Sequence, residues 1–471
     1  MGRKKREEVI EELEIESIGF EGISIARVDN HVRFIKGGVP GDIVNAVQFK
    51  KKKNRIESKI KEIIKPSPQR IDPKCKYFGD CGGCSWQNMP YIEQLKWKTT
   101  HVTDAFVRQE KLHIGKLEDI LPSPSEFNYR NKMEFSFGAS RWMTVNEIRD
   151  QEEIEQKYFA LGLHAKGRFD KVIDIHECHI HDSEANFILN TVRDISLELD
   201  LKPYNLRTHE GFVRNLMIRK SYYQNEFLVV LITNKVKDDF ESAAIEKISL
   251  ALKERFKGSF IHAVNSKINP TNIDNSELLW GNGYLIERVL NVDFKISAFS
   301  FFQTNSTQLD NFIGEILKKA EIGKDDIVWD LYCGTGSISL PAAKISKKVY
   351  GIELFEQSVI DARNNAKLNN IENSEFFTAD LHSKDTPDLM NDLEKPNIII
   401  LDPPRGGIHS NLLDHLLKLN VHKIIYVSCN PMTQARDCKI LNEKYEIISL
   451  KPVDMFPQTY HIESIAVLSL K

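Results

Sequence analysis

The sequence lacks any long apolar stretch, and this absence bears on where the protein works. It contains no uninterrupted run of about 18 apolar residues, the length that a membrane-spanning helix needs. Its first residues, Met1–Glu8, are charged and lead into no apolar segment of signal-peptide length. We therefore expect a soluble, cytoplasmic protein without a membrane partner.

Net charge is also nearly absent, because 64 basic side chains are balanced by 67 acidic ones. A formal charge of −3 excludes a general attraction to nucleic acid. Residues 31–75 differ, since they hold 12 Lys and Arg against 4 Asp and Glu, an excess of 8 positive charges. Any site for a polyanion is therefore expected to be local.

Cysteines are few and clustered. Seven in 471 residues, an odd number, argue against a secreted disulfide scaffold and for a reducing compartment. Cys75, Cys81 and Cys84 fall within ten residues, and Cys178 follows much later between nearby histidines. This grouping predicts bound metal. Four thiolates suit either tetrahedral zinc or an iron–sulfur cube, and the spacing leaves both open, with the histidines two residues before and one residue after Cys178 as substitute ligands.

Length and local pattern predict three domains, since a domain usually has roughly 150 residues. Residues 1–68 alternate short β-like stretches with glycines, which is typical of a small OB-like β-barrel. Residues 69–290 mix helical and β-rich runs and predict an α+β domain. Residues 291–471 repeat strand, turn and helix, which predicts a doubly wound, Rossmann-like α/β sheet. The fold class is therefore α/β, with two smaller domains preceding the sheet.

Basic residues gather between two strand-like runs of the first domain, at Lys50–Lys53 and Arg55. On a hairpin, such long side chains could reach a phosphate backbone. A solvated loop would have the same composition, so both interpretations stay open.

A glycine turn, Asp330–Gly336, follows a predicted strand and precedes a helical segment that begins near Ser337. Ligands bind at this end of strands in open α/β sheets. Glu353 ends the next strand and Asp380 the third, where an acid can accept hydrogen bonds from ribose hydroxyls. Because Ser339 replaces the third glycine of the dinucleotide motif, S-adenosylmethionine fits better than NAD.

Two more strand ends should meet the same sheet edge, namely Asp402–Arg405 and Ser428–Pro431. The prolines present the Asp402 carboxylate rigidly. Cys429 precedes a predicted helix, whose amino end favours a thiolate, although a buried inert thiol is equally compatible. Near the carboxyl end, Glu463 alone is typical of a surface residue and His461 of a structural histidine.

Together these motifs resemble the uracil-5-methyltransferases of ribosomal and transfer RNA, particularly the ribosomal branch with an iron–sulfur cluster. The resemblance covers almost the whole chain. It implies that residues 11–65 are a TRAM domain, an RNA-binding barrel, and Asn128–Lys132 is similar to a motif of the family's central domain. It also implies a 4Fe-4S cluster, whose ligands would be Cys75, Cys81, Cys84 and Cys178. Residues 139–160 look like a family-variable insertion.

The resemblance also implies roles in the last domain. The nucleophile matches Cys429 and the general base Glu463. The contacts to S-adenosylmethionine carry over to Gln303, Tyr332, Glu353, Asp380 and Asp402. Candidate contacts to the RNA backbone are Arg130, Lys132, Arg214, Arg219 and Lys220.

The implied reaction is methylation of carbon 5 of a uridine in 23S ribosomal RNA through a covalent adduct between Cys429 and carbon 6. Two alternatives remain: the same chemistry on a tRNA uridine, and a non-catalytic RNA-binding or ribosome-assembly protein. We expect a monomer whose partner is RNA and not DNA.

Overall fold

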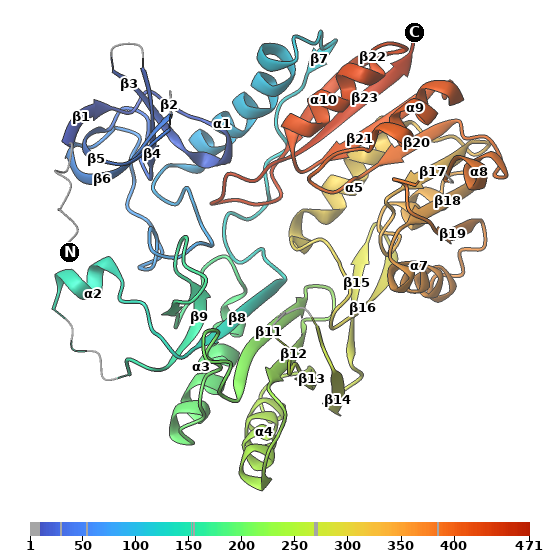
Figure 1. The fold of residues 1–471 in the computed structure, drawn as a ribbon. Coiled ribbons are helices and arrows are strands. Elements are labelled where there is room, and N and C mark those ends of the chain that lie inside the picture. The colour runs from blue at the N-terminus through green and yellow to red at the C-terminus, as the bar shows by residue number, and fades with distance from the viewer. Residues whose placement is uncertain are drawn as a thin grey trace.

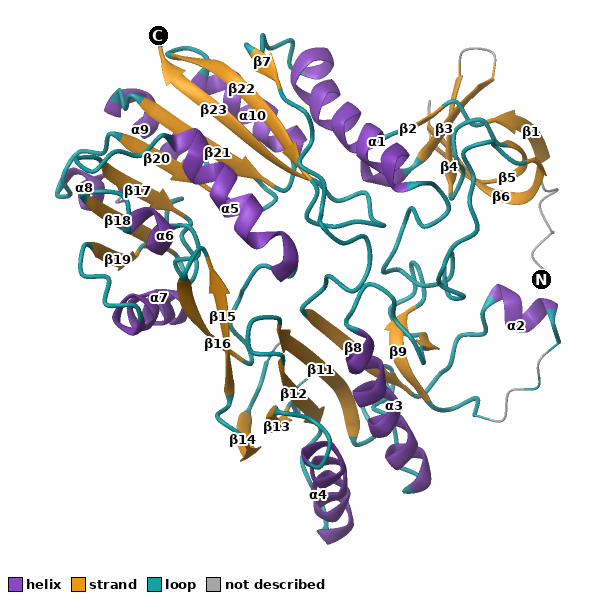
Figure 2. Cartoon of the chain, turned by 180° about the vertical axis from the view of Figure 1, so that it is seen from behind, coloured by secondary structure: helices purple, strands orange, loops and turns teal. Residues whose placement is uncertain are grey.

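The structure is a computed structural model that describes residues 10–28, 31–52, 55–151, 153, 156–267, 272–383 and 386–471. Three parts surround a central region filled by loops, with the first sheet beside α1 and the largest sheet at the carboxyl end (Figures 1 and 2). Lys53 of the basic run, and residues 152, 154 and 155 of the predicted insertion, lie outside the described residues.

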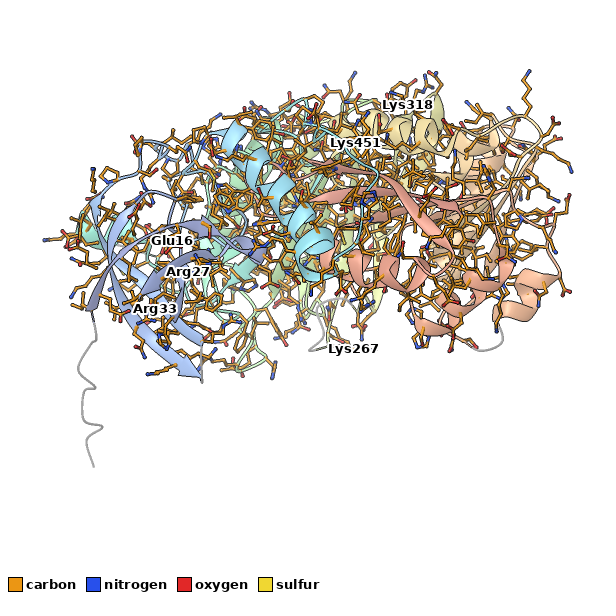
Figure 3. The ribbon with its side chains drawn as sticks, turned by 90° about the horizontal axis from the view of Figure 1, so that it is seen from above. Glu16, Arg27, Arg33, Lys267, Lys318 and Lys451 are labelled. Carbon is orange, nitrogen blue, oxygen red and sulfur yellow. The ribbon has the colours of Figure 1, made fainter. Side chains whose placement is uncertain are left out.

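The first part is a sheet with strand order β1-β5-β6-β4-β3-β2. Alternating residues point inward, so Leu13, Ile35 and Val44 share a small core. β5 and β6 pair as a hairpin up to Lys52 and Arg55, which puts the basic run at its tip as predicted. Figure 3 shows Glu16, Arg27 and Arg33 on this part. The elements are β1 (Ile10–Glu14), β2 (Ser17–Ile18), η1 (Phe20–Gly22), β3 (Ser24–Val28), β4 (His31–Lys36), β5 (Ile43–Lys52) and β6 (Arg55–Lys65).

The second part is a mixed sheet with strand order β10-β9-β8-β11-β12-β13-β14, so the predicted α+β pattern is present. Only β12 and β13 run parallel within this sheet's described strands, and α4 connects them. Apolar side chains of α3 and α4 pack on the sheet in one core, which includes Ile188 and Ile248. The elements are α2 (Val145–Arg149), α3 (Ser183–Glu198), α4 (Asp239–Lys253), β8 (Lys132–Gly138), β9 (Ala160–His164), β10 (Val172–Asp174), β11 (Val213–Ser221), β12 (Glu226–Thr233), β13 (Gly258–Val264) and β14 (Asn275–Trp280).

The third part is a sheet with order β19-β18-β17-β20-β21-β23-β22-β7, preceded by a hairpin of β15 (Tyr284–Val289) and β16 (Val292–Ser297). β17 to β21 are parallel, and β23 inserts antiparallel between β21 and β22. Separate apolar cores cover the two faces, which confirms the predicted doubly wound sheet. The strands are β17 (Ile327–Leu331), β18 (Lys348–Glu353), β19 (Ser374–Thr378), β20 (Ile398–Leu401), β21 (Lys423–Ser428), β22 (Tyr445–Val453) and β23 (Glu463–Leu470). The helices are α5 (Ser306–Ala320), α6 (Ser339–Ala343), α7 (Glu356–Leu368), α8 (Thr386–Asn391), α9 (Ser410–Leu419) and α10 (Pro431–Leu441).

An earlier stretch of chain also joins this sheet. α1 (Tyr91–Thr103) continues into a π-helical turn, η2 (Asp104–Gln109), whose Phe106 lies in the same core as α9 and α10. β7 (Lys116–Leu117) then pairs with β22 at the sheet edge. Residues between 91 and 117 therefore lie in the predicted central domain by sequence but pack on the carboxyl-terminal sheet.

Two local predictions were wrong. The helix after the glycine turn begins at Ser339 and not near Ser337, because Tyr332, Gly334 and Gly336 all have positive φ and keep the chain in a turn. Arg214, Arg219 and Lys220 are not available to an RNA backbone. Arg214 and Arg219 are buried on β11 and donate to the Asn265 and Ser300 carbonyls, and the partly buried Lys220 donates to the Asp182 carboxylate.

None of the helices in the described part of the chain combines the length and apolarity needed to cross a bilayer.

Candidate active site

The parallel strands of the large sheet end at one edge, and each carries a predicted functional residue just beyond its end. Because these ends meet, the side chains line a single cavity of about 520 Å³. The cavity brings together all the predicted residues of this domain: Gln303, Tyr332, Glu353, Asp380, Asp402, Cys429 and Glu463.

The glycine turn and Glu353 form one wall of the cavity. The amide of Gly334 donates to Glu353 Oε2 at 3.1 Å, and the amides of Leu354 and Phe355 donate to Oε1 at 2.8 and 3.1 Å. A Cβ added at Gly334 would meet no atom within 4 Å, so the space beside this residue is open to a ligand. A fixed carboxylate beside such a space can accept hydrogen bonds from vicinal hydroxyls.

Two exposed aromatic rings line the same cavity, and the sequence analysis assigned neither a role. Phe301 is 65% exposed and Phe355 67% exposed, which is unusual for large apolar side chains. Phe301 directly precedes Phe302 and Gln303, and Phe355 follows Glu353 by two positions, so adjacency to predicted contacts is the signal that could have identified them. Exposed rings beside a cavity can stack on planar ligand groups.

Carboxyl groups at the sheet edge hold protons more strongly than usual. Burial raises the pKa of Asp402 to about 7. Burial and then the neighbouring Asp402 raise the pKa of Glu463 well above its ordinary value. Glu463 is only 5% exposed, so the interpretation of this residue as a surface acid was wrong. Its strand, β23, lies between two others, which buries its first residue.

Cys429 follows β21 and precedes α10, as predicted, but its electrostatics differ from the prediction. Burial, then Glu463 and Asp402, raise the pKa of the Cys429 thiol to about 12, whereas Arg405 lowers it. The partial positive charge of a helix amino end is therefore outweighed by burial beside two carboxyl groups. The site holds a protonated thiol next to groups that can accept its proton.

His461 and Arg405 form a second pair that the sequence analysis did not assign to the site. Arg405 Nη2 lies 3.1 Å from His461 Nδ1. Burial and then Arg405 lower the pKa of His461 to about 4, so the ring is neutral near pH 7. Because an arginine only donates, Nδ1 is the acceptor and the ring proton lies on Nε2. His461 thus contributes a donor at the cavity wall and is not merely a structural histidine.

The four predicted cysteine ligands lie together elsewhere, in the core of the second part. Cys75, Cys81, Cys84 and Cys178 are free thiols that line one small cavity of about 20 Å³. Burial raises the pKa of the Cys81 and Cys84 thiols to about 12. In the part of the chain that is described, no group of three or more His, Cys, Asp or Glu side chains is arranged to hold a metal ion.

The histidines beside Cys178 differ in position. His176 is exposed and its Nε2 lies 3.3 Å from Asp174, outside the thiol cavity. His179 lines the cavity, and its Nδ1 lies 3.4 Å from Glu177. The thiols from all four predicted positions therefore line one cavity, and His179 lines it with them.

Comparison with known proteins gives consistent results. Residues 215–471 match the family described as tRNA (uracil-5-)-methyltransferase. An uncharacterised RNA methyltransferase of Chlorobaculum tepidum is 40% identical over 91% of this chain and 89% of its own length. Another, from Bacteroides thetaiotaomicron, is 38% identical over 96% of this chain and 99% of its own.

One solved structure is similar over nearly the full length. It is the tRNA (uracil-54, C5)-methyltransferase of Pyrococcus abyssi in complex with S-adenosyl-L-homocysteine, with a TM-score of 0.74 and 24% identity. The match covers 97% of this chain and 100% of the other. This likeness confirms the predicted fold class.

Proposed function

The chain belongs to the tRNA (uracil-5-)-methyltransferase family, and on that premise we propose that it methylates carbon 5 of a uridine in 23S ribosomal RNA with S-adenosylmethionine as donor. The observation that carries this proposal is the single cavity shared by Cys429, Glu463 and Glu353. A thiol, a base and a ribose-binding acid in one space are what the reaction needs.

The donor would bind along the glycine turn. Glu353 accepts hydrogen bonds from the ribose hydroxyls, and Phe355 packs against the adenine ring. Tyr332, Asp380 and Gln303 complete the wall. The open space beside Gly334 and the three amides that hold the Glu353 carboxylate support this assignment.

The covalent step begins at Cys429. Its sulfur bonds to carbon 6 of the uracil while the electrons of the 5,6 double bond form an enolate, and the thiol proton passes to the neighbouring Asp402 carboxylate, so that Glu463 stays available for the proton of carbon 5. Burial raises the pKa of Asp402 to about 7, which makes its carboxylate a stronger base than an ordinary aspartate and so supports this transfer. Cys429 thus becomes a thiolate as it adds, not before.

Methyl transfer and elimination complete the cycle. Carbon 5 displaces the methyl group from the sulfonium, which leaves S-adenosylhomocysteine. Glu463, as carboxylate, takes the proton of carbon 5, and the electrons of that bond restore the double bond and expel the Cys429 sulfur. Arg405 and His461 present donors at the same wall and would hold the uracil carbonyls.

We further propose that Cys75, Cys81, Cys84 and Cys178 hold a 4Fe-4S cluster. Four unpaired thiols around one apolar cavity fit a soft, all-sulfur donor set. The resemblance to the cluster-bearing branch, and not the spacing of the thiols, favours an iron–sulfur cube over a single zinc ion. When bound, the cluster would tie the Cys75–Cys84 loop to Cys178.

The basic hairpin of the TRAM-like sheet would contact the RNA backbone. Lys50 and Arg55 extend near its tip, and Lys36 Nζ lies 5.5 Å from the ring centre of Phe49, which is itself exposed. Cations beside an exposed ring are typical of single-stranded RNA sites. The target uridine must leave its stack to enter the cavity, at a cost of a few kcal/mol that a loop lowers.

A tRNA uridine is the second candidate substrate. It is favoured by the name of the Pyrococcus abyssi protein, whose similarity covers 97% of this chain. The four clustered thiols favour the ribosomal branch, because the resemblance to that branch includes them.

Mapping 5-methyluridine in both RNA classes tests the proposal. Cells without this gene should lose the modification at a 23S ribosomal RNA position, and the purified protein should restore it with S-adenosylmethionine. Loss confined to tRNA would instead establish the second candidate. Failure to bind S-adenosylmethionine would leave a non-catalytic RNA-binding protein.

A further inference from the structure

The Asn128–Lys132 motif contributes no group to the proposed chemical steps. It lies where three segments meet, namely the Cys178 loop, the start of α5 and the loop between β22 and β23. Residues 128–131 lie between the Cys178 loop and the start of α5, after a left-handed backbone conformation at Asn128. On one side, the amides of Asn128 and Arg130 donate to the carbonyls of His179 and Ile180, both at 2.9 Å. On the other, the amide of Asn131 donates to the Thr304 carbonyl at 2.8 Å.

Tyr129 extends this connection to the loop that carries the proposed base. Its side chain is fully buried, and its hydroxyl donates to the Pro457 carbonyl at 3.0 Å. Pro457 lies in the loop between β22 and β23, which also carries His461 and ends at Glu463. The ring belongs to the same apolar core as Cys178, so a single side chain links that core to the loop.

Asn131 fixes the opposite wall of the cavity. Its side-chain nitrogen, Nδ2, donates to the Gln303 carbonyl and to Ser306 Oγ, both at 2.8 Å. The Ser306 hydroxyl is already committed as a donor to Glu287 at 2.8 Å, so it accepts from Asn131. Glu287 is buried, which makes this chain of hydrogen bonds rigid. The geometry therefore requires a donor at Asn131.

We propose, on the basis of the proposed function, that Tyr129 and Asn131 are positioning residues that hold the Glu463 loop and the Gln303 turn in register across the cavity. Tyr129 sets the position of the loop through Pro457, and Asn131 sets the turn through Gln303. Neither residue lines the cavity, so both act through these partners. Cys429, between β21 and α10, is held independently of both.

This arrangement predicts which chemical step each residue controls. Displacing the Glu463 loop slows removal of the carbon 5 proton but leaves addition of Cys429 intact, so the covalent adduct accumulates. Asn305 also ties the two walls, because its Nδ2 donates to the Met455 carbonyl at 3.0 Å. Loss of the Tyr129 hydroxyl therefore weakens the alignment without abolishing it, by about tenfold in turnover for one buried hydrogen bond.

The test compares Tyr129→Phe with Tyr445→Phe. Tyr445 is also fully buried, and its hydroxyl accepts from the Val421 amide at 3.1 Å, away from the cavity, so it controls for the loss of a buried hydroxyl. Both variants are incubated with S-adenosylmethionine and substrate RNA, and the covalent protein–RNA adduct is measured on denaturing gels beside the rate of methylation. In parallel, hydrogen exchange of the amides of residues 457–462 is measured without RNA.

Tyr129→Phe should show about tenfold slower turnover, more adduct than the wild type, and faster amide exchange in residues 457–462, with unchanged affinity for S-adenosylmethionine. Tyr445→Phe should show none of these. An adduct level equal to that of the wild type would overturn the proposal, because a residue that only packs the core lowers stability without trapping an intermediate.

Asn131→Asp provides a second variant of nearly the same size, which replaces the donor by an oxygen that repels the Gln303 carbonyl. It should slow methylation at least tenfold, because Gln303 lies on the donor's wall of the cavity. This variant carries the test if Tyr129→Phe does not fold, and a wild-type rate of methylation would refute the role of Asn131. If even the wild type forms neither adduct nor 5-methyluridine with any RNA, the proposed function fails. The exchange measurement then still decides whether Tyr129 holds the loop.

Discussion

Lys98 and Asp454 form an ion pair that is completely buried although 356 residues separate them in the sequence. Lys98 Nζ lies 2.6 Å from Asp454 Oδ1, and neither side chain is exposed. The same ammonium donates to the Phe456 carbonyl at 3.0 Å. This pair therefore anchors the start of the loop that ends at Glu463 to α1, complementing the Tyr129 contact further along.

Removing one partner of this pair should destabilise the protein strongly. In Lys98→Met the Asp454 carboxylate stays buried without its cation, and we expect a loss of about 3–5 kcal/mol in the free energy of unfolding. Lys98→Met combined with Asp454→Asn should recover part of this loss. Urea denaturation measures the free energy of unfolding of both variants. As a control, Lys439→Met removes a more exposed ion pair with Glu110 and should change this free energy by less than about 1 kcal/mol. Equal effects of Lys98→Met and Lys439→Met would contradict the prediction.

Cys429→Ala should abolish methylation, because no other group can add to carbon 6. We expect a drop of more than about a thousandfold in turnover, with no covalent RNA adduct. Cys438→Ala is the matched control, since Cys438 is buried on α10, the helix that follows Cys429, and lies outside the cavity. It should keep methylating, at some cost in stability. Substantial turnover by Cys429→Ala would remove this residue as nucleophile.

Glu463→Gln should trap the covalent intermediate. The amide cannot accept the proton of carbon 5, so addition and methyl transfer proceed while elimination stalls. Denaturing gels should show methylated RNA attached to the protein, and released product should fall about a hundredfold or more. Normal product release from this variant would assign the base to another residue.

Asp330 makes stability depend on pH. Burial, opposed by the Ser339 hydroxyl, raises the pKa of this carboxyl to about 7, above its ordinary 3.8. Between about pH 4 and pH 7 the folded state thus binds a proton that the unfolded chain has released. The stabilisation from this proton is full below about pH 4 and is lost as the pH rises through 7. The free energy of unfolding falls by on the order of 4 kcal/mol over this range. Asp330→Asn should therefore flatten the fall in melting temperature between pH 5 and pH 8, and identical slopes in both proteins would refute this.

The thiol cluster should control iron content. Cys84→Ser removes one of the four converging thiols, and we expect iron and acid-labile sulfide in the purified protein to fall severalfold, with loss of visible absorbance. Cys333→Ser, at a buried thiol of the carboxyl-terminal part, should leave iron unchanged. A protein that contains zinc but no iron and is fully active would overturn the cluster assignment.

The parallel strands and the residues at their ends could be predicted from the sequence because both are encoded locally. Apolar runs such as Ile398–Leu401 are long enough for a buried parallel strand, and the polar residue after each run must lie at the shared carboxyl edge. For this reason Glu353, Asp402 and Cys429 were expected together and do line one cavity.

Burial and charge environment, in contrast, were decided only by the tertiary structure. Glu463 is buried because β23 inserts between β21 and β22. The pKa of Cys429 is raised by burial and then by Glu463 and Asp402, which come from other strand ends. Arg214 and Lys98 are likewise paired or enclosed by partners remote in the sequence. Local pattern sets which elements form and where they end, whereas the neighbours that desolvate or charge a side chain come from segments that only the folded chain brings together.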